Sequence, residues 1–149
     1  MIKGVIFDWG RTLYDSDAGA LFPETLGVLT SLAQKYRLAV VSLVGDGDIE
    51  RRRRIFQETG VARFFASTQF APCNKPALFT AALRDLCLTA AEVAIVDDRV
   101  VRGIAWGNQH GAITVWVRRG KFSDETPDRA SGVPHHVISS LGELLTLQL

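Results

Sequence analysis

Five short apolar runs alternate along the chain with longer segments in which apolar residues recur at helical spacing. The runs are 3–8, 38–42, 64–67, 93–97 and 113–117. Several are apolar throughout, as is typical of strands covered on both faces. The segments with helical spacing are 23–36, 48–59, 75–88, 100–109 and 139–147. The alternation predicts parallel βαβ units, in which one sheet has helices on both sides.

Polar residues stand where several predicted strands end. Asp8 follows the first apolar run, Ser42 ends the second, and the fourth ends in Asp97 and Asp98. Ligands of such sheets bind outside the carboxyl ends of the strands, so these side chains are expected to meet at one rim. Neighbouring strand residues face opposite ways, so we expect only one of the two adjacent aspartates, Asp98, to face the site.

Two further residues belong to the candidate site: Thr12, in the irregular run after Asp8, and Lys75, at the predicted start of a helix. Together the residue types suit phosphoryl transfer. A carboxylate can attack phosphorus and form an acyl phosphate. It needs a cation such as Mg²⁺, because carboxylate and phosphate repel each other. A hydroxyl and a lysine can hold the remaining phosphoryl oxygens.

These residues make the chain resemble the haloacid dehalogenase (HAD) superfamily. The resemblance rests on four motifs in order: Asp8-Trp9-Gly10-Arg11-Thr12 after an apolar strand, LAVVS ending at Ser42, Lys75-Pro76 opening a helix, and VAIVDD ending at Asp97-Asp98. It implies a HAD-like Rossmannoid fold, a three-layer α/β/α sandwich around a mainly parallel five-stranded sheet.

The resemblance also implies roles for the site residues. Asp8 would be the nucleophile and, with Asp98 and the backbone carbonyl of Gly10, would hold Mg²⁺. Ser42 and Lys75 would bind the phosphoryl group, and Lys75 would also take part in catalysis. Thr12 would brace the loop and belong to the phosphate-binding set.

Three positions depart from the family pattern. Gly10 stands where the family's phosphatases carry a second aspartate, which protonates the leaving group and later activates water. Gly103 stands where a second acid usually follows the one matching Asp98, and Arg11 replaces a frequent glycine. The sequence leaves open whether another acid compensates; the candidates are Asp46, Asp48 and Asp97.

The spacing of the motifs predicts a single core domain, 1–149, without a cap. About thirty residues separate Leu13 from Ser42, and as many separate Ser42 from Lys75. Neither gap has room for a cap of ~60 residues beside its helical crossover. An open site of this kind suits a phosphorylated small molecule or macromolecule, and a homo-oligomer could supply a lid.

Net charge, cysteine spacing and the N-terminal pattern limit the classes of partner and the cellular compartment that we expect. The net charge of +1 gives no field that favours nucleic acid or an anionic membrane. Cys73 and Cys87 form no metal or disulfide pattern, and the N-terminus shows no signal-peptide pattern, so the cytoplasm is expected. The run Arg51–Arg54 is read as a solvated helix face, although at least one of four consecutive helical residues must face the protein.

The first functional hypothesis is a Mg²⁺-dependent phosphohydrolase that uses Asp8. The alternative is a catalytically degenerate HAD domain that binds a phosphorylated ligand or a protein, and Gly10 and Gly103 favour it. Dehalogenases and phosphonate-cleaving relatives also lack the second aspartate, but both rely on a cap.

Overall fold

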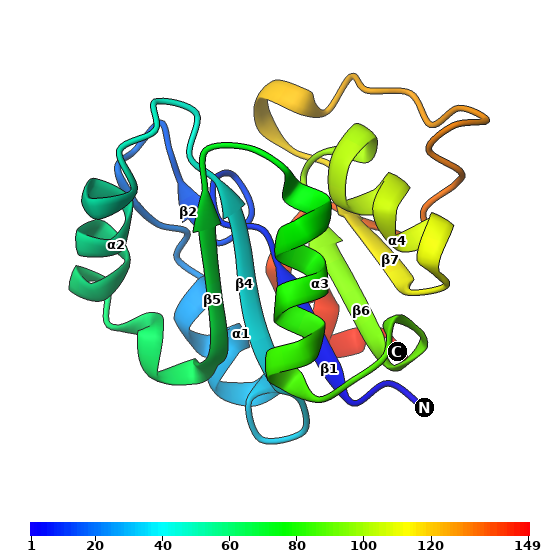
Figure 1. Cartoon of the computed structure of the whole chain (residues 1–149), viewed down its shortest axis with the longest axis horizontal. Helices are drawn as coiled ribbons and strands as arrows, with labels where there is room; N and C mark the ends of the chain where they lie inside the picture. The colour runs from blue at the N-terminus through cyan, green and yellow to red at the C-terminus, as the bar shows by residue number, and fades with distance from the viewer.

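The computed structural model describes all 149 residues as an α/β fold around a six-stranded, fully parallel sheet (Figure 1). The strand order is β5-β4-β1-β6-β7-β8. The strands are β1 (Gly4–Phe7), β4 (Arg37–Leu43), β5 (Phe65–Ala71), β6 (Val93–Asp97), β7 (Ile113–Val117) and β8 (His136–Ile138). The α-helices are α1 (Thr25–Leu32), α2 (Ile49–Glu58), α3 (Lys75–Leu86) and α4 (Ala105–His110).

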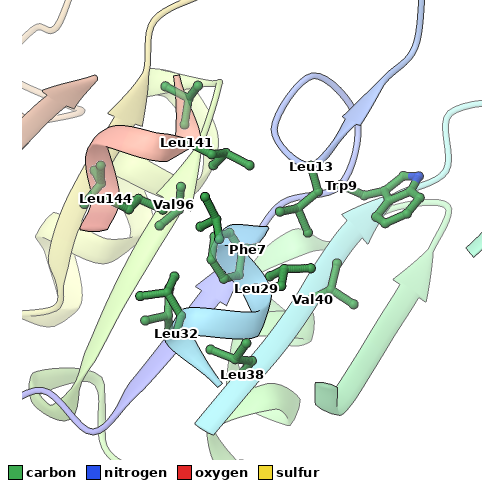
Figure 2. Close-up of a cluster of buried hydrophobic side chains, with 14 of the residues drawn as sticks. Phe7, Trp9, Leu13, Leu29, Leu32, Leu38, Val40, Val96, Leu141 and Leu144 are labelled. Atoms are coloured by element: carbon green, nitrogen blue, oxygen red, sulfur yellow. The ribbon is translucent and has the colours of Figure 1, made fainter. Parts of the chain in front are cut away.

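Apolar side chains cover both faces of the sheet, because neighbouring strand residues point to opposite sides. On one face, Phe7 packs in a cluster with residues of α1 and of the 3₁₀ segment Leu141–Thr146, including Leu29 and Leu144 (Figure 2). On the other face, Ile6 belongs to a cluster with Phe79 of α3 and Trp106 of α4. The arrangement confirms helices on both sides of a parallel sheet.

The expectation of five strands was wrong, because β8 pairs in parallel with β7 and adds a sixth. This edge strand has three residues and only Ile138 is buried, so it lacks the apolar run that marked the others. The segment predicted as helix 139–147 is a 3₁₀ segment, Leu141–Thr146. The segment predicted as 100–109 divides into a π-helical turn, Val100–Ile104, and α4.

Only small elements occupy the gaps between the motifs. Between β1 and β4 lie α1 and a two-stranded hairpin formed by β2 (Tyr14–Asp15) and β3 (Ala20–Leu21). Between β4 and β5 lie α2 and the 3₁₀ turn Val61–Phe64. No separate cap is evident in either gap. None of its helices combines the length and the apolar character needed to cross a membrane.

The sheet order places the motif-bearing strands side by side. β1 lies between β4 and β6, and Phe7 pairs with both Val40 and Val96. The residues that follow these strand positions therefore emerge at the same edge of the sheet, and α3 starts at that edge (Figure 1).

Candidate active site

Asp8 directly follows the fully buried strand β1, and its backbone N–H donates to the carbonyl of Val96 at 2.9 Å. This bond fixes the start of the loop, and the Asp8 side chain keeps 11% of its surface exposed. Its Oδ1 accepts from Lys75 Nζ at 3.0 Å, and the buried hydroxyl of Thr12 lies 3.5 Å from its Oδ2. Asp8 is therefore braced and still reachable from solvent.

Lys75 opens α3, where Asn74 caps the helix by accepting from the N–H of Ala77. Its side chain is 5% exposed, and Nζ lies between Asp8 Oδ1 at 3.0 Å and Asp97 Oδ2 at 2.7 Å. Burial opposes the charge, but the two carboxylates outweigh it and raise the pKa of Lys75. A permanently charged lysine thus ties α3 to the ends of β1 and β6.

Asp97 also faces the site, so the expectation that only one of the adjacent aspartates would do so was wrong. β6 ends at Asp97, and Asp98 lies beyond it in a bend where strand alternation no longer applies. Besides contacting Lys75, Asp97 Oδ2 accepts from the N–H of Gly103 at 2.9 Å, and Oδ1 accepts from the N–H of Arg99 at 3.0 Å. Both oxygens of Asp97 therefore have partners within the protein.

Asp98 completes a cluster of three carboxylates. One oxygen each of Asp8, Asp97 and Asp98 lies within 4.8 Å of the others. Burial and the charges of its two neighbours raise the pKa of Asp98 to about 9, and burial also raises the pKa of Asp8. The three carboxylates, of which Asp97 and Asp98 are buried, share one lysine, so the cluster is short of positive charge. A hard, all-oxygen donor set of this kind fits Mg²⁺.

Ser42 is buried at the end of β4, where its hydroxyl accepts from Arg52 Nη1 at 2.6 Å. Arg52 belongs to the Arg51–Arg54 run and is the member that turns toward the site. Its guanidinium is half-buried and has no carboxylate within 4.0 Å. The sequence predicted that at least one arginine of this run faces the protein, but it did not predict that this arginine lies at the site.

Most of the predicted site residues line one cavity of about 130 Å³. Asp8, Gly10, Ser42 and Asp98 all line it, whereas Thr12 and Lys75 contact Asp8 without lining it. Four arginines also line the cavity: Arg11, Arg52, Arg99 and Arg102. Because both carboxylates and guanidinium groups line it, the cavity suits an anion bound next to a cation.

The chain between β7 and β8 reaches this cavity, and Phe122 is among the residues that line it. Its Phe122 ring lies 3.7 Å from the guanidinium carbon of Arg99 and 5.7 Å from that of Arg11. Glu125 accepts from Arg99 Nε through both oxygens at 3.2 Å. Arg11, at the position where the family often has glycine, adopts a left-handed backbone with φ of 60°. These contacts place aromatic and cationic groups along the rim.

Asp46 and Asp48, the other candidates to replace missing acids, lie beside this cavity and do not line it. Asp48 caps α2 by accepting from the N–H of Arg51. Asp46 accepts from the N–H of Asp48 at 2.9 Å. Both carboxylates shape the loop after β4.

Comparison with known proteins gives one family and one curated relative. A family described as HAD-hydrolase-like matches residues 72–144, the part that holds Lys75, Asp97 and Asp98. Glyceraldehyde 3-phosphate phosphatase of Methanopyrus kandleri is 37% identical over 70 residues. That match covers 47% of this chain and 30% of the relative, so the chain corresponds to less than a third of the relative's length.

Solved structures share the fold. The 2-haloacid dehalogenase of Pseudomonas syringae pv. Tomato DC3000 has a TM-score of 0.77 at 20% identity, over 98% of this chain and 97% of that chain. YfnB of Bacillus subtilis, solved bound to magnesium, has a TM-score of 0.67 at 19% identity, over 86% of this chain and 56% of that chain. At such identities the likeness shows the fold alone.

Proposed function

Because this chain belongs to the HAD-like hydrolase superfamily, we propose that it is a Mg²⁺-dependent phosphohydrolase that forms an aspartyl-phosphate on Asp8. The observation that carries the proposal is the position of Asp8. Its carboxylate lines a 130 Å³ cavity together with Asp98, Ser42 and Arg52. A carboxylate nucleophile, a cation site and phosphate-binding groups thus share one small space within the core domain, 1–149.

In the first step, one oxygen of Asp8 attacks phosphorus while the bond from phosphorus to the leaving-group oxygen breaks. Lys75 holds Oδ1 at 3.0 Å and keeps the carboxylate oriented. The hydroxyl of Ser42, itself fixed by Arg52 at 2.6 Å, would hold a phosphoryl oxygen. Positioned charges of this kind stabilise the spread negative charge of the transition state.

The groups that would hold Mg²⁺ are the carboxylates of Asp8 and Asp98 and the backbone carbonyl of Gly10, and all three residues line the cavity. When bound, Mg²⁺ offsets the repulsion between the carboxylates and the phosphoryl group. Asp97 is assigned a positioning role, because Lys75 and two backbone N–H groups already engage its oxygens.

Gly10 sets the limits of this chemistry, because no side chain at position 10 can donate a proton to the leaving group. Aryl and acyl phosphates have stable leaving groups, so the rate of their cleavage falls little when the leaving group departs unprotonated. Esters with alkoxide leaving groups lose the most rate without a general acid. The proposed activity is therefore selective for esters with stable leaving groups.

The lack of an acid at position 10 also favours a second candidate function, a domain that binds a phosphorylated ligand without hydrolysing it. The two candidates differ in turnover and share the binding site. A domain of the second kind would bind inorganic phosphate and Mg²⁺ at the same cavity while releasing no product.

A phosphate-release assay with p-nitrophenyl phosphate, with and without Mg²⁺, separates the candidates. The phosphohydrolase should show Mg²⁺-dependent release that is lost in Asp8→Asn. Glu58→Gln is the matched control, because Glu58 is an exposed acid at the end of α2. Activity that survives Asp8→Asn would contradict the assignment of the nucleophile. Phosphate binding without release in the wild type would favour the binding domain.

A further inference from the structure

A second cavity, of about 270 Å³, lies next to the Asp8 cavity, between the β2–β3 hairpin and α2. Apolar side chains in its lining include Tyr14 and Ile55, with the buried Trp9 stacked on Tyr14 at 5.2 Å between ring centroids. Asp46 and Arg51 are among the polar residues that line it. We call this cavity the hairpin groove.

The hairpin groove and the Asp8 cavity share two lining residues, Ser16 and Arg52. These residues form the neck between the two spaces. A Cβ built on Gly10 would lie 3.2 Å from Ser16 Oγ, so a side chain at position 10 would project toward this neck. The family's second aspartate acts on the leaving group from that position. The direction in which a side chain at position 10 would project therefore indicates that the leaving group lies on the side of the hairpin groove.

Arg52 is the charged group at this neck. It donates from Nη1 to Ser42 Oγ, and no carboxylate lies within 4.0 Å of it. Most other arginines near the two cavities are paired: Arg99 with Glu125, Arg11 with Asp17 and Arg51 with Asp46. A half-buried guanidinium with free donors and no anionic partner is suited to an anion that arrives with the substrate.

We propose that the hairpin groove receives the non-phosphate part of the substrate, a compact phenol, and that Arg52 offsets the charge on the departing oxygen. The inference rests on the proposed phosphohydrolase and specifies its substrate class. The groove lies just below the ~300 Å³ at which typical small-molecule pockets begin, so it fits a single ring. Its apolar lining residues suit a ring face, and its polar lining residues suit hydroxyl groups.

Arg52 would act on the negative charge that forms on the leaving-group oxygen. As the bond from Asp8 to phosphorus forms, the ester bond breaks and its electron pair stays on the leaving-group oxygen. With Gly10 in place of an acid, this oxygen departs as an anion and takes its proton from water afterwards. The guanidinium of Arg52 at the neck stabilises the anion without transferring a proton.

Binding of two phosphonates, which have no ester bond to cleave, tests the groove. In titration calorimetry with Mg²⁺, the wild type should bind phenylphosphonate about tenfold more tightly than methylphosphonate, because the ring is buried. Ile55→Trp should fill the groove and remove this preference while methylphosphonate still binds. The wild-type comparison needs no variant, so equal affinities would overturn the groove even if Ile55→Trp does not fold.

The outcomes separate this inference from the proposed function. Equal affinity of the wild type for both phosphonates would overturn the groove and leave the phosphohydrolase standing. Binding of neither phosphonate would overturn the phosphate site itself. A preference for phenylphosphonate that Ile55→Trp retains would place the ring elsewhere and would also overturn the groove.

Kinetics with two aryl esters test Arg52. Arg52→Met should lower kcat/KM for phenyl phosphate by about 10²-fold, and by much less for p-nitrophenyl phosphate, whose leaving group stabilises its own charge. Arg54→Met is the matched control, since Arg54 is exposed on the same helix and should leave both rates unchanged. Equal losses on both esters would show that Arg52 only positions Ser42 and would overturn its leaving-group role.

Discussion

The carboxylate of Asp97 occupies the space that a side chain at position 103 would need. A Cβ built on Gly103 would overlap Asp97 Oδ2 and would lie 2.9 Å from the carboxyl carbon. The N–H of Gly103 donates to the same oxygen at 2.9 Å, and that oxygen also accepts from Lys75. The HAD resemblance places an acid at 103, and in this chain Asp97 brings a carboxylate to the same place. The glycine is thus a steric requirement of Asp97.

This relationship predicts that Gly103→Asp alone destabilises the protein, whereas Asp97→Gly combined with Gly103→Asp recovers much of the loss. The single substitution forces two carboxylates into one buried space, at a cost of about 2–4 kcal/mol in free energy of unfolding. The double substitution leaves one carboxylate in that space, and Lys75 keeps its contact with Asp8. Urea unfolding of the wild type and the three variants gives the coupling energy directly.

Gly27→Ala is the control for a glycine without such a requirement. Nothing lies within 4 Å of a Cβ built at Gly27, which is exposed in α1. Alanine there should stabilise the helix by about 0.5–1 kcal/mol. If Gly103→Asp were as well tolerated as Gly27→Ala, or if Asp97→Gly gave it no relief, the exchange between positions 97 and 103 would be refuted.

Binding of Mg²⁺ should release protons and tighten with rising pH. Burial and the charges of Asp8 and Asp97 raise the pKa of Asp98 to about 9, so Asp98 is mostly protonated at neutral pH without metal. The cation must displace this proton, and the apparent affinity should rise by up to about tenfold per pH unit below that pKa. Calorimetry in buffers of different ionisation enthalpy counts the protons released. Asp98→Asn should bind Mg²⁺ weakly and without this pH dependence.

The same pKa predicts how the stability of the metal-free protein depends on pH. The folded-state pKa of Asp98 lies above its unfolded value of 3.8, so the folded protein holds this proton more tightly. Its contribution therefore favours folding at low pH and is lost progressively as pH rises toward about 9. Thermal unfolding should show that Mg²⁺ raises Tm more at pH ~8 than at pH ~6. An equal increase at both values would contradict the proton linkage.

The sequence predicted the parts of the site that rest on regular strand geometry. The apolar runs ending at Asp8 and Ser42 and the alternation of strands and helices were enough to bring Asp8, Ser42 and Asp98 to one edge of a parallel sheet. Parallel strands covered on both faces leave a plain apolar signal, and their ends define the rim.

The sequence could not predict the features that depend on irregular backbone or on side-chain direction. Asp97 joined the site because β6 ends at that residue, and the following π-helical turn directs the N–H of Gly103 back to it. The orientation of Arg52 toward the site depends on where α2 begins, and the Asp48 cap sets that start. β8 is too short, and too polar at its start, to give a pattern of its own.

Restoring an acid at position 10 should raise turnover. Gly10 is not in the left-handed region, and the nearest atom to a Cβ built there is Ser16 Oγ at 3.2 Å, so aspartate fits after a small shift of the serine. A general acid is worth ~10²–10⁴-fold, and the gain should be greatest for alkyl esters such as glycerol 3-phosphate. Steady-state kinetics of Gly10→Asp, alone and with Ser16→Ala to provide space, measure it. A folded variant that binds Mg²⁺ but gains nothing would exclude the missing acid as the limit on rate.

The second half-reaction should be the slow one. With p-nitrophenyl phosphate the first step needs no acid, because the leaving group is stable as an anion. The second step needs water to be activated against the acyl phosphate on Asp8, and position 10, from which the family's base acts, carries no side chain. The first step should therefore be faster than the second, and phosphorylated Asp8 should accumulate.

Rapid mixing with p-nitrophenyl phosphate and Mg²⁺ should then give a burst of nitrophenol stoichiometric with enzyme, followed by a slow steady rate. Acid quenching and intact-mass analysis should show an adduct of one phosphoryl group, which Asp8→Asn lacks. In Gly10→Asp the burst should shrink as the second step accelerates, because the new carboxylate can serve as the base. Linear kinetics without an adduct would mean that another group activates water. The two acids nearest the cavity rim in the loop after β4, Asp46 and Asp48, would then be the first to replace by asparagine, although Asp48 also caps α2 and its replacement needs an unfolding control.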